Sequence, residues 1–402
     1  MEGKSAPAAA AAAVSAVLDD DDLLGEILLR VAFPTCLVVA ALVCRRWLRL
    51  ASASAFLRRF RDLHPPSLLG FYVVPAGTSP SRFVQLPQPP ELASVVSRAS
   101  FDLDSLGSDS FDVDCCNGLL LLTTIHMYPN RPVHTTRVRC PLYPARDTTT
   151  LPPVPNTSII HGDGITYYDR EILPKGNDGG DGMSYFCLAI GSKEHKTVMD
   201  VYVLEGDVWA IHSSAVTEIP KIDLLLSSTL IGNGKIYNVA PVNNSPKLIL
   251  LDLVSSSLSV VNFPEEMNPS SYELSLTDDS GLHLIHVKGF QLRIWLHKMI
   301  DSGVSSWFLE GTICLREIWA NCMMPTCIFK DASDSFVKVH AVGVNSEFVF
   351  LEMDAVIYLF DIKRKVANKV YEVTAEDKSL ASVIPFMMVW PPKFPVMDDG
   401  KM

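Results

Sequence analysis

The chain has 402 residues, of which 48% are hydrophobic, and this is enough for a large buried core and more than one domain. Its formal net charge is −11, so the chain as a whole would repel a nucleic-acid backbone, and we do not expect a nucleic-acid partner. Nine cysteines, an odd number without disulfide-like spacing, indicate a reducing compartment, the cytoplasm or the nucleus.

The N-terminal segment is rich in alanine and lacks the leucine-rich core of a secretory signal. We therefore interpret residues 1–17 as a disordered leader. The apolar run "CLVVAALVC" at residues 36–44 stops at Arg45 and falls short of the roughly 18 residues that a membrane-spanning helix needs. We expect a soluble protein with no membrane partner.

Three short helices are expected between residues 18 and 60. Four aspartates precede the first helix, where carboxylates cap free backbone amides and complement the helix dipole. Apolar residues then recur with the spacing of one helix face, at Leu23, Leu24, Ile27, Leu28 and Val31. Pro34 suits the first turn of a second helix, and the spacing of Val43, Trp47 and Leu50 predicts a third. So small a unit has more apolar surface than it can bury, which predicts a partner site.

The order of these features resembles the F-box motif: Leu18, an acidic turn, "LLGEIL", Leu37, "LVCRRWLRL" and Phe56. The sequence that follows, "FLRRFRDLHPPSLLGFYV", is similar to plant, especially grass, F-box proteins with a large C-terminal associated domain. An F-box implies docking to the Skp adaptor and, through it, to a cullin scaffold. By position, the adaptor-facing residues of the family would fall on Leu18, Leu23, Leu24, Ile27, Leu28, Leu37, Val43, Cys44 and Trp47.

Two features of this unit admit other interpretations. The family's Leu-Pro opening reads Leu18–Asp19 here, and these helices could instead form only the core of a subdomain packed against the rest of the chain. A basic cluster comprises Arg45, Arg46, Arg49, Arg58, Arg59 and Arg61. A solvated helix face that balances the acidic run explains this cluster better than a phosphate-binding site does.

After the proline-rich stretches "HPPSL" and "QLPQPPEL", the pattern changes to short paired strands. The clearest unit, residues 234–263, reads "GKIYNV", "KLILLDL", a tight "SSS" turn and "LSVVNF". Related units are expected at residues 185–213, at residues 282–313 and from "EFVFLE" to "VANKVYEV". Asp252 and Asp361 precede matching turns and can accept hydrogen bonds from the turn amides.

Repetition at this spacing predicts a propeller-like ring, because each small sheet can bury its faces only against its neighbours. Residues 68–125, which include "ASFDLDSL", would supply one or two further blades. Within them, "DCCNGLLLL" resembles the Asp-Cys-x-x-Gly segment of grass F-box associated domains. The number of blades and the closure of the ring stay open.

The expected fold is therefore α+β and multidomain, with a small three-helix F-box followed by an all-β, propeller-like domain of degenerate repeats. We expect a leader at 1–17, the F-box at 18–60, a proline-rich linker and first strand at 61–92, the β-rich domain at 93–392 and a tail at 393–402.

No motif for catalysis or metal binding stands out, so we name no catalytic residue, cofactor or metal ligand. Cys314, Cys322 and Cys327 lack zinc-finger spacing and are expected to be buried. His283 and His286 would point to opposite faces of a strand. The stretch "GNDGGDG" at residues 176–182 lacks the order of calcium ligands, and we interpret it as an exposed loop.

With the resemblance, these patterns predict a substrate-recognition subunit of a Skp/cullin/F-box ubiquitin ligase. Its helices would hold the adaptor and its β-domain would bind an unidentified target protein, without catalysis by the chain itself. Residues 167–184 and 297–306 are expected to be target-binding loops, since both exceed a tight turn. The alternatives are a propeller-fold enzyme or ligand-binding protein with an incidental helical N-terminus, and an F-box protein that acts outside a ligase.

Overall fold

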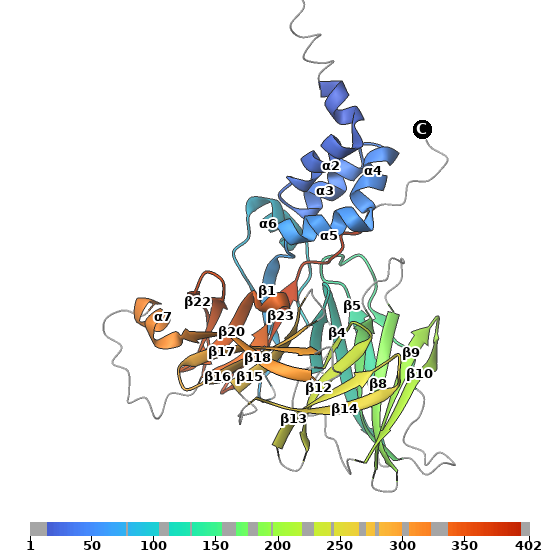
Figure 1. Ribbon diagram of the computed structural model, residues 1–402, viewed down its shortest axis with the longest axis vertical. Helices are drawn as coiled ribbons and strands as arrows, with labels where there is room; N and C mark the ends of the chain where they lie inside the picture. Colours follow the sequence, from blue (N-terminus) through green and yellow to red (C-terminus); the bar gives the residue numbers. More distant parts are fainter. Residues whose placement is uncertain are drawn as a thin grey trace, which may run out of the picture.

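The structure is a computed structural model, and it describes residues 14–77, 79–103, 112–128, 131–154, 166–175, 184–193, 196–218, 229–242, 245–264, 271–277, 281–299, 305–322 and 337–394. A helical unit, coloured blue in Figure 1, lies at one end of the molecule, and strands fill the other end. Within the described ranges, no helix is both long and apolar enough to cross a membrane.

Four helices build the helical unit: α2 (Asp21–Leu29), α3 (Pro34–Ala41), α4 (Arg45–Ser52) and α5 (Ser54–Leu63). The start of α2 confirms the sequence prediction, since the carboxylate of Asp20 accepts the backbone amides of Asp22 and Leu23 at 2.9 and 3.0 Å. Pro34 occupies the first turn of α3, where a missing N–H leaves no intrahelical bond unmade.

Two expectations for this unit are corrected. The prediction of three helices omits α5, whose arginine-rich sequence obscures Phe56 and Phe60, the pair four residues apart that buries one side of it. The leader, expected to be disordered at 1–17, is helical over residues 14–19, while residues 1–13 lie outside the described part of the chain.

Five four-stranded antiparallel sheets follow along the described chain, each one blade of a propeller. The first three blades contain β3 (Asp112–Cys116), β4 (Leu119–Tyr128), β5 (Arg131–Arg139) and β6 (Thr149–Thr150); β7 (Thr166–Lys175), β8 (Ser184–Lys193), β9 (Lys196–Glu205) and β10 (Val208–Thr217); and β11 (Leu230–Gly232), β12 (Lys235–Val242), β13 (Ser245–Asp252) and β14 (Ser257–Asn262). The next two contain β15 (Tyr272–Leu276), β16 (Leu282–Lys288), β17 (Gln291–Met299) and β18 (Ser305–Cys314); and β19 (Lys338–Val342), β20 (Phe348–Met353), β21 (Val356–Asp361) and β22 (Val366–Glu372).

A sixth sheet closes the ring with strands from both ends of the β-rich region, β1 (Leu68–Pro75), β2 (Arg82–Gln85) and β23 (Leu380–Met387). Strand β1 pairs antiparallel with β23, from Leu68 opposite Met387 to Pro75 opposite Leu380. The described residues therefore form a six-bladed β-propeller. The sequence had left open the number of blades and whether the ring closes, and the structure shows six blades in a closed ring.

Neighbouring blades meet at the centre of the ring through their inner strands. Contacts join β15 to β19, β19 to β23 and β23 to β3, and the remaining strands of each blade run outward in chain order. Because alternate strands of a blade run in opposite directions, the first-to-second and third-to-fourth turns of all blades fall on one face. We call this face the hairpin face.

The repeated units of the sequence analysis are confirmed as the second to fourth strands of four blades. The two predicted turn aspartates act as expected. Asp252 accepts the amides of Val254 and Ser255 at 3.0 and 2.9 Å, and Asp361 accepts the amide of Arg364 at 2.8 Å. These side-chain acceptors fix the turn from the third to the fourth strand in two blades.

The predicted target-binding loops are corrected in part. Strand β7 includes residues 167–175 and β17 continues to Met299, so these stretches are strand rather than loop. Residues 176–183 and 300–304 lie outside the described part of the chain, and with them lies "GNDGGDG". The described strand ends on either side of these residues lie on the hairpin face, since β7 and β8 are a first and a second strand and β17 and β18 a third and a fourth.

Further local corrections concern strands, helices and a cysteine. No strand occurs at residues 99–103, the described part of "ASFDLDSL", and two short helices, α6 (Pro90–Val96) and α7 (Leu315–Cys322), interrupt the strand-rich region. Cys314, at the end of the outer strand β18, is exposed rather than buried. The side chains of Cys322 and Cys327 lie outside the described set.

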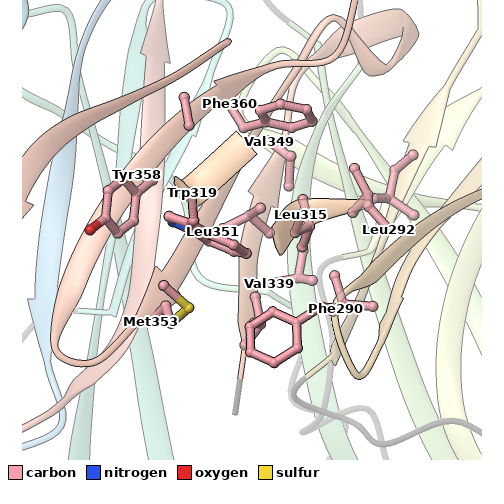
Figure 2. Close-up of a cluster of buried hydrophobic side chains, with 14 of the residues drawn as sticks. Phe290, Leu292, Leu315, Trp319, Val339, Val349, Leu351, Met353, Tyr358 and Phe360 are labelled. Carbon is pink, nitrogen blue, oxygen red and sulfur yellow. The ribbon is translucent and has the colours of Figure 1, made fainter. Parts of the chain in front are cut away.

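Buried side chains between the blades make the propeller core, and Figure 2 shows one cluster between the blades that begin with β15 and β19. Helix α7 inserts Trp319 there, with its ring centroid 6.2 Å from that of Phe290 and 5.8 Å from that of Tyr358. Trp319 is 1% exposed, so this connecting helix belongs to the core. Each blade is thus stabilised mainly by apolar contact with its neighbours.

A buried carboxylate ties the last four-stranded blade to the closing sheet. Asp377 lies between β22 and β23, and its side chain is fully buried against Arg82 of β2 at 2.5 Å. It also accepts hydrogen bonds from the Tyr371 hydroxyl at 2.7 Å and from the amide and hydroxyl of Thr374, both at 2.8 Å. Burial alone would raise the pKa of Asp377, but these hydrogen bonds and the Arg82 charge hold it below its ordinary value of 3.8.

We predict that Asp377→Asn lowers the free energy of unfolding by about 2 kcal/mol near neutral pH, because four donor groups on three residues lose a charged acceptor. A carboxyl with a lowered pKa stabilises the fold above its unfolded pKa, and this stabilisation is lost as the pH falls through the folded value. The difference between variant and parent should therefore shrink below about pH 4. Urea unfolding at several pH values checks this. Asp361→Asn, at an exposed turn, is the control, and an equal loss in both variants would contradict the assignment.

Candidate functional site

The helical unit has its own apolar core, to which α2, α3, α4 and α5 all contribute. Leu24, Leu28, Leu37 and Phe60 are at most 1% exposed, and Trp47 and Leu50 of α4 pack against this cluster. The spacing of these residues places them on the inward sides of the helices. The helices therefore fold around one another and leave their other sides for further contacts.

The nine predicted adaptor-facing residues divide into three groups by burial. Leu24, Leu28 and Leu37 are buried in the core of the helical unit. Leu18, Cys44 and Trp47 are partly buried. Leu23, Ile27 and Val43 are exposed at 47%, 42% and 64%.

The structure adds two exposed apolar residues that the predicted adaptor-facing set leaves out. Val39 of α3 and Leu42 directly after it are 66% and 54% exposed. A usable signal was present, because "PTCLVVAALV" is apolar on every side of a short helix, and a surface helix of that kind needs a second partner. We define the exposed apolar set as Leu23, Ile27, Val39, Leu42 and Val43.

Arginines of α4 and α5 hold α2 in place. Arg46 donates to Asp21 Oδ1 at 2.7 Å and to the Leu18 carbonyl at 2.6 Å, and Arg59 donates to Glu26 Oε1 at 2.7 Å. The hydrogen bond from Arg59, and then that from Arg30, lowers the pKa of Glu26. These pairs agree with the interpretation of the basic cluster as a partner of the acidic residues. They also orient α2 so that Leu23 and Ile27, one turn apart, stay on the solvent-facing side of the helix.

Several titratable side chains of the propeller are bonded to or enclosed by other residues. Among the described residues, no three His, Cys, Asp or Glu side chains gather as a metal site would require. His283 of β16 contacts Ser346 Oγ at 2.8 Å and Glu310 Oε2 at 3.0 Å, so its ring nitrogens have structural partners. Glu273 on the inner strand β15 is surrounded by protein, and burial raises its pKa to about 8.

The "DCCNG" segment forms the β3–β4 hairpin. Burial raises the pKa of the Cys115 thiol well above its ordinary value and that of Cys116 to about 12, so both thiols stay protonated and unreactive at neutral pH. Asn117 and Gly118 adopt positive φ angles of 47° and 73° in the turn. Figure 1 shows this edge of the propeller facing the helical unit.

Fold and surface together define a six-bladed β-propeller that carries an N-terminal helical unit with exposed apolar residues. A family described as "F-box protein AT5G49610-like, beta-propeller" matches residues 113–394. That is more than half of the chain, and the chain belongs to this family. The match begins after the helical unit, within the propeller.

Comparison with curated proteins gives no match. Solved structures to which the chain is similar include TolB from Acinetobacter baumannii, at 11% identity and a TM-score of 0.35, over 73% of this chain and 62% of TolB. A functionally unknown protein from Desulfotomaculum acetoxidans has 11% identity and a TM-score of 0.37, over 77% and 80% of the two chains. A lectin from Aleuria aurantia has 14% identity and a TM-score of 0.35, over 74% and 86%. Likenesses this distant say nothing about ligands or partners.

We predict that two adjacent leucines of α2 differ sharply when shortened. Leu24→Ala should destabilise the helical unit by about 2–5 kcal/mol, because it leaves a cavity in a fully buried site. Leu23→Ala, at a site 47% exposed, should change the stability by about 0.5 kcal/mol or less. Urea unfolding followed by helix circular dichroism checks both. Similar losses in the two variants would show that the inward face of α2 is assigned wrongly.

Proposed function

We propose that this chain is the substrate-recognition subunit of a Skp/cullin/F-box ubiquitin ligase. The single observation that carries the proposal is the exposed apolar set on a helical unit joined to a propeller of an F-box protein family. Five large apolar side chains on α2, α3 and the turn after α3 cost free energy when exposed to water, and a partner that covers them recovers it.

The chemistry of the exposed apolar set favours a helical protein partner. Leu23 and Ile27 lie one turn apart on α2, and Val39, Leu42 and Val43 recur at three- and four-residue spacing along α3 and its end. Such rows of aliphatic side chains pack against the ridges of other helices. The Skp adaptor that the F-box resemblance implies would meet this requirement, and a cullin scaffold would follow through the adaptor.

The propeller would bind the target protein. Its strands are committed to the core between blades, so recognition would fall on turns and loops that are free to vary. The hairpin face is our candidate, outside the β3–β4 turn that the helical unit and residues 388–394 approach, because the described strand ends that flank the two segments expected to bind the target lie on this face. The chain would contribute proximity between the target and a conjugating enzyme brought by the scaffold, without a catalytic step of its own.

We predict that the double change Leu23→Ala with Ile27→Ala weakens binding of a purified Skp adaptor by at least about 25-fold, since a central interface residue contributes about 2 kcal/mol. Isothermal titration with the full chain measures this. The matched control is Val366→Ala on β22, which is 46% exposed and lies on the propeller. Unchanged affinity in a folded double variant would refute the docking surface.

The same variants separate a ligase subunit from the alternatives. In affinity purification with mass spectrometry, the double variant should lose the adaptor and cullin while it keeps the target proteins of the parent chain. Wild-type chain that captures targets but no adaptor would contradict the proposal and favour an F-box protein acting outside a ligase.

A further inference from the structure

Residues 388–394, directly after the ring-closing strand β23, run from the propeller to the helical unit. Met388 donates its amide to the Ser67 carbonyl at 2.9 Å, which continues the β1–β23 ladder by one step. Trp390 and Phe394 then pack against the helical core. One short segment thus contacts both parts of the molecule.

Trp390 is held from two sides. Its ring stacks on that of Phe60 of α5, with centroids 6.0 Å apart and planes 7° from parallel. Its backbone N–H donates to Asn117 Oδ1 of the β3–β4 turn at 2.6 Å. The aromatic contact is therefore with the helical unit, and the hydrogen bond is with the first four-stranded blade.

The turn that receives this segment leaves no room for another side chain. A Cβ atom on Gly118 would come within 2.3 Å of Val389 Cγ2, far below any normal contact. The Asn-Gly pair therefore serves two purposes at once: the asparagine oxygen accepts the Trp390 amide, and the bare glycine lets Val389 approach. This gives a physical role to the "DCCNG" segment, which the proposed function leaves unexplained.

Phe60 is central to the helical core. It is fully buried, and its ring also lies 4.6 Å from that of His64, whose Nε2 contacts the Leu29 carbonyl at 2.8 Å. Loss of Trp390 would uncover one face of Phe60 and leave a cavity beside α5. Trp390 follows the last ring-closing pair, Leu68 with Met387, by three residues, so it cannot stay in place if β23 leaves the ring.

We propose that residues 388–394, seated on the Asn117–Gly118 turn, form a latch that couples closure of the propeller to the stability of the helical unit. Only a chain whose ring has closed with β23 would place Trp390 and Phe394 against the core of the helical unit and so complete that core. The consequence for adaptor docking rests on the proposed function, but the coupling itself does not. The latch would keep an incompletely closed or truncated chain from presenting stable helices.

Hydrogen exchange of the full-length chain, read by mass spectrometry, tests the latch. In Trp390→Ala, amides of α2 and α5 should exchange about tenfold faster or more, while those of β8 and β9 stay at the parental rate. Trp390→Phe should restore much of the protection, because it keeps an aromatic ring on Phe60. Gly118→Ala should act in the same direction as Trp390→Ala.

The control is Gly234→Ala at the β11–β12 turn. Gly234 has nearly the same backbone angle as Gly118, φ of 69° against 73°, but a Cβ there meets only Val254 Cγ2 at 3.7 Å. Backbone strain is thus matched and only the contact with the latch differs. Parental exchange of α2 and α5 in a folded Gly118→Ala chain would overturn the proposal, whether Trp390→Ala is equally unchanged or unfolded throughout. The proposal would also be overturned if α2 and α5 amides exchanged as fast in Gly234→Ala as in Gly118→Ala.

Adaptor titration of the same variants keeps the two proposals distinct. Faster exchange in α2 and α5 of Trp390→Ala supports the latch whether or not an adaptor binds. A wild-type chain that binds no adaptor refutes only the proposed function.

Discussion

The antiparallel pairing of β1 with β23 is the constraint on which the rest of the molecule depends. A small sheet buries its faces only against neighbouring sheets, so an open arc of blades would leave apolar surface at both ends. Pairing residues 68–75 with residues 380–387 removes those ends. This pairing costs conformational entropy, because the loop that it closes contains nearly the whole propeller. The buried Asp377, which contacts Arg82 of β2 and Tyr371 of β22, joins this closing sheet to the preceding blade.

Ring closure also determines where the helices lie. The chain leaves α5 at Leu63 and enters β1 at Leu68, and β23 returns to the same place before Trp390. Phe33, between α2 and α3, packs against the propeller cluster that contains Phe386 and Met388. The helical unit is thus held to the propeller by the chain before the ring, by the chain after it and by direct apolar contact. A docking partner on the helices would therefore be oriented with respect to the propeller.

The sequence predicts the strands whose side chains obey a simple pattern. Strands such as β13 and β21 are continuous apolar runs with an aspartate before a tight turn, and these were identified with their turns. The sequence does not predict the inner strands of the later blades. Strand β11 has three residues, and β19 reads "KVHAV" with His340 buried and bonded to Glu352 at 2.7 Å. Short length and buried polar residues conceal an inner strand, since its place at the ring centre comes from tertiary contacts.

For the candidate site, the sequence predicts the helices and their apolar residues but not which of two adjacent ones faces inward. Leu23 and Leu24 are neighbours with opposite environments, because consecutive residues of a helix point about 100° apart. The latch could not be predicted at all. It joins Asn117 to Trp390 across 273 positions, and neither residue lies in a periodic pattern that would connect the two.

The central claim, that the helices dock an adaptor while the propeller remains free for a target, is tested most directly by a hydrogen-exchange footprint. The full chain is compared alone and in the presence of saturating Skp adaptor. The account predicts slower exchange in the segments that carry the exposed apolar set, residues 21–29 and 34–43, with β-strand amides unchanged. Protection confined to the propeller, or no protection anywhere at saturating adaptor, would contradict it.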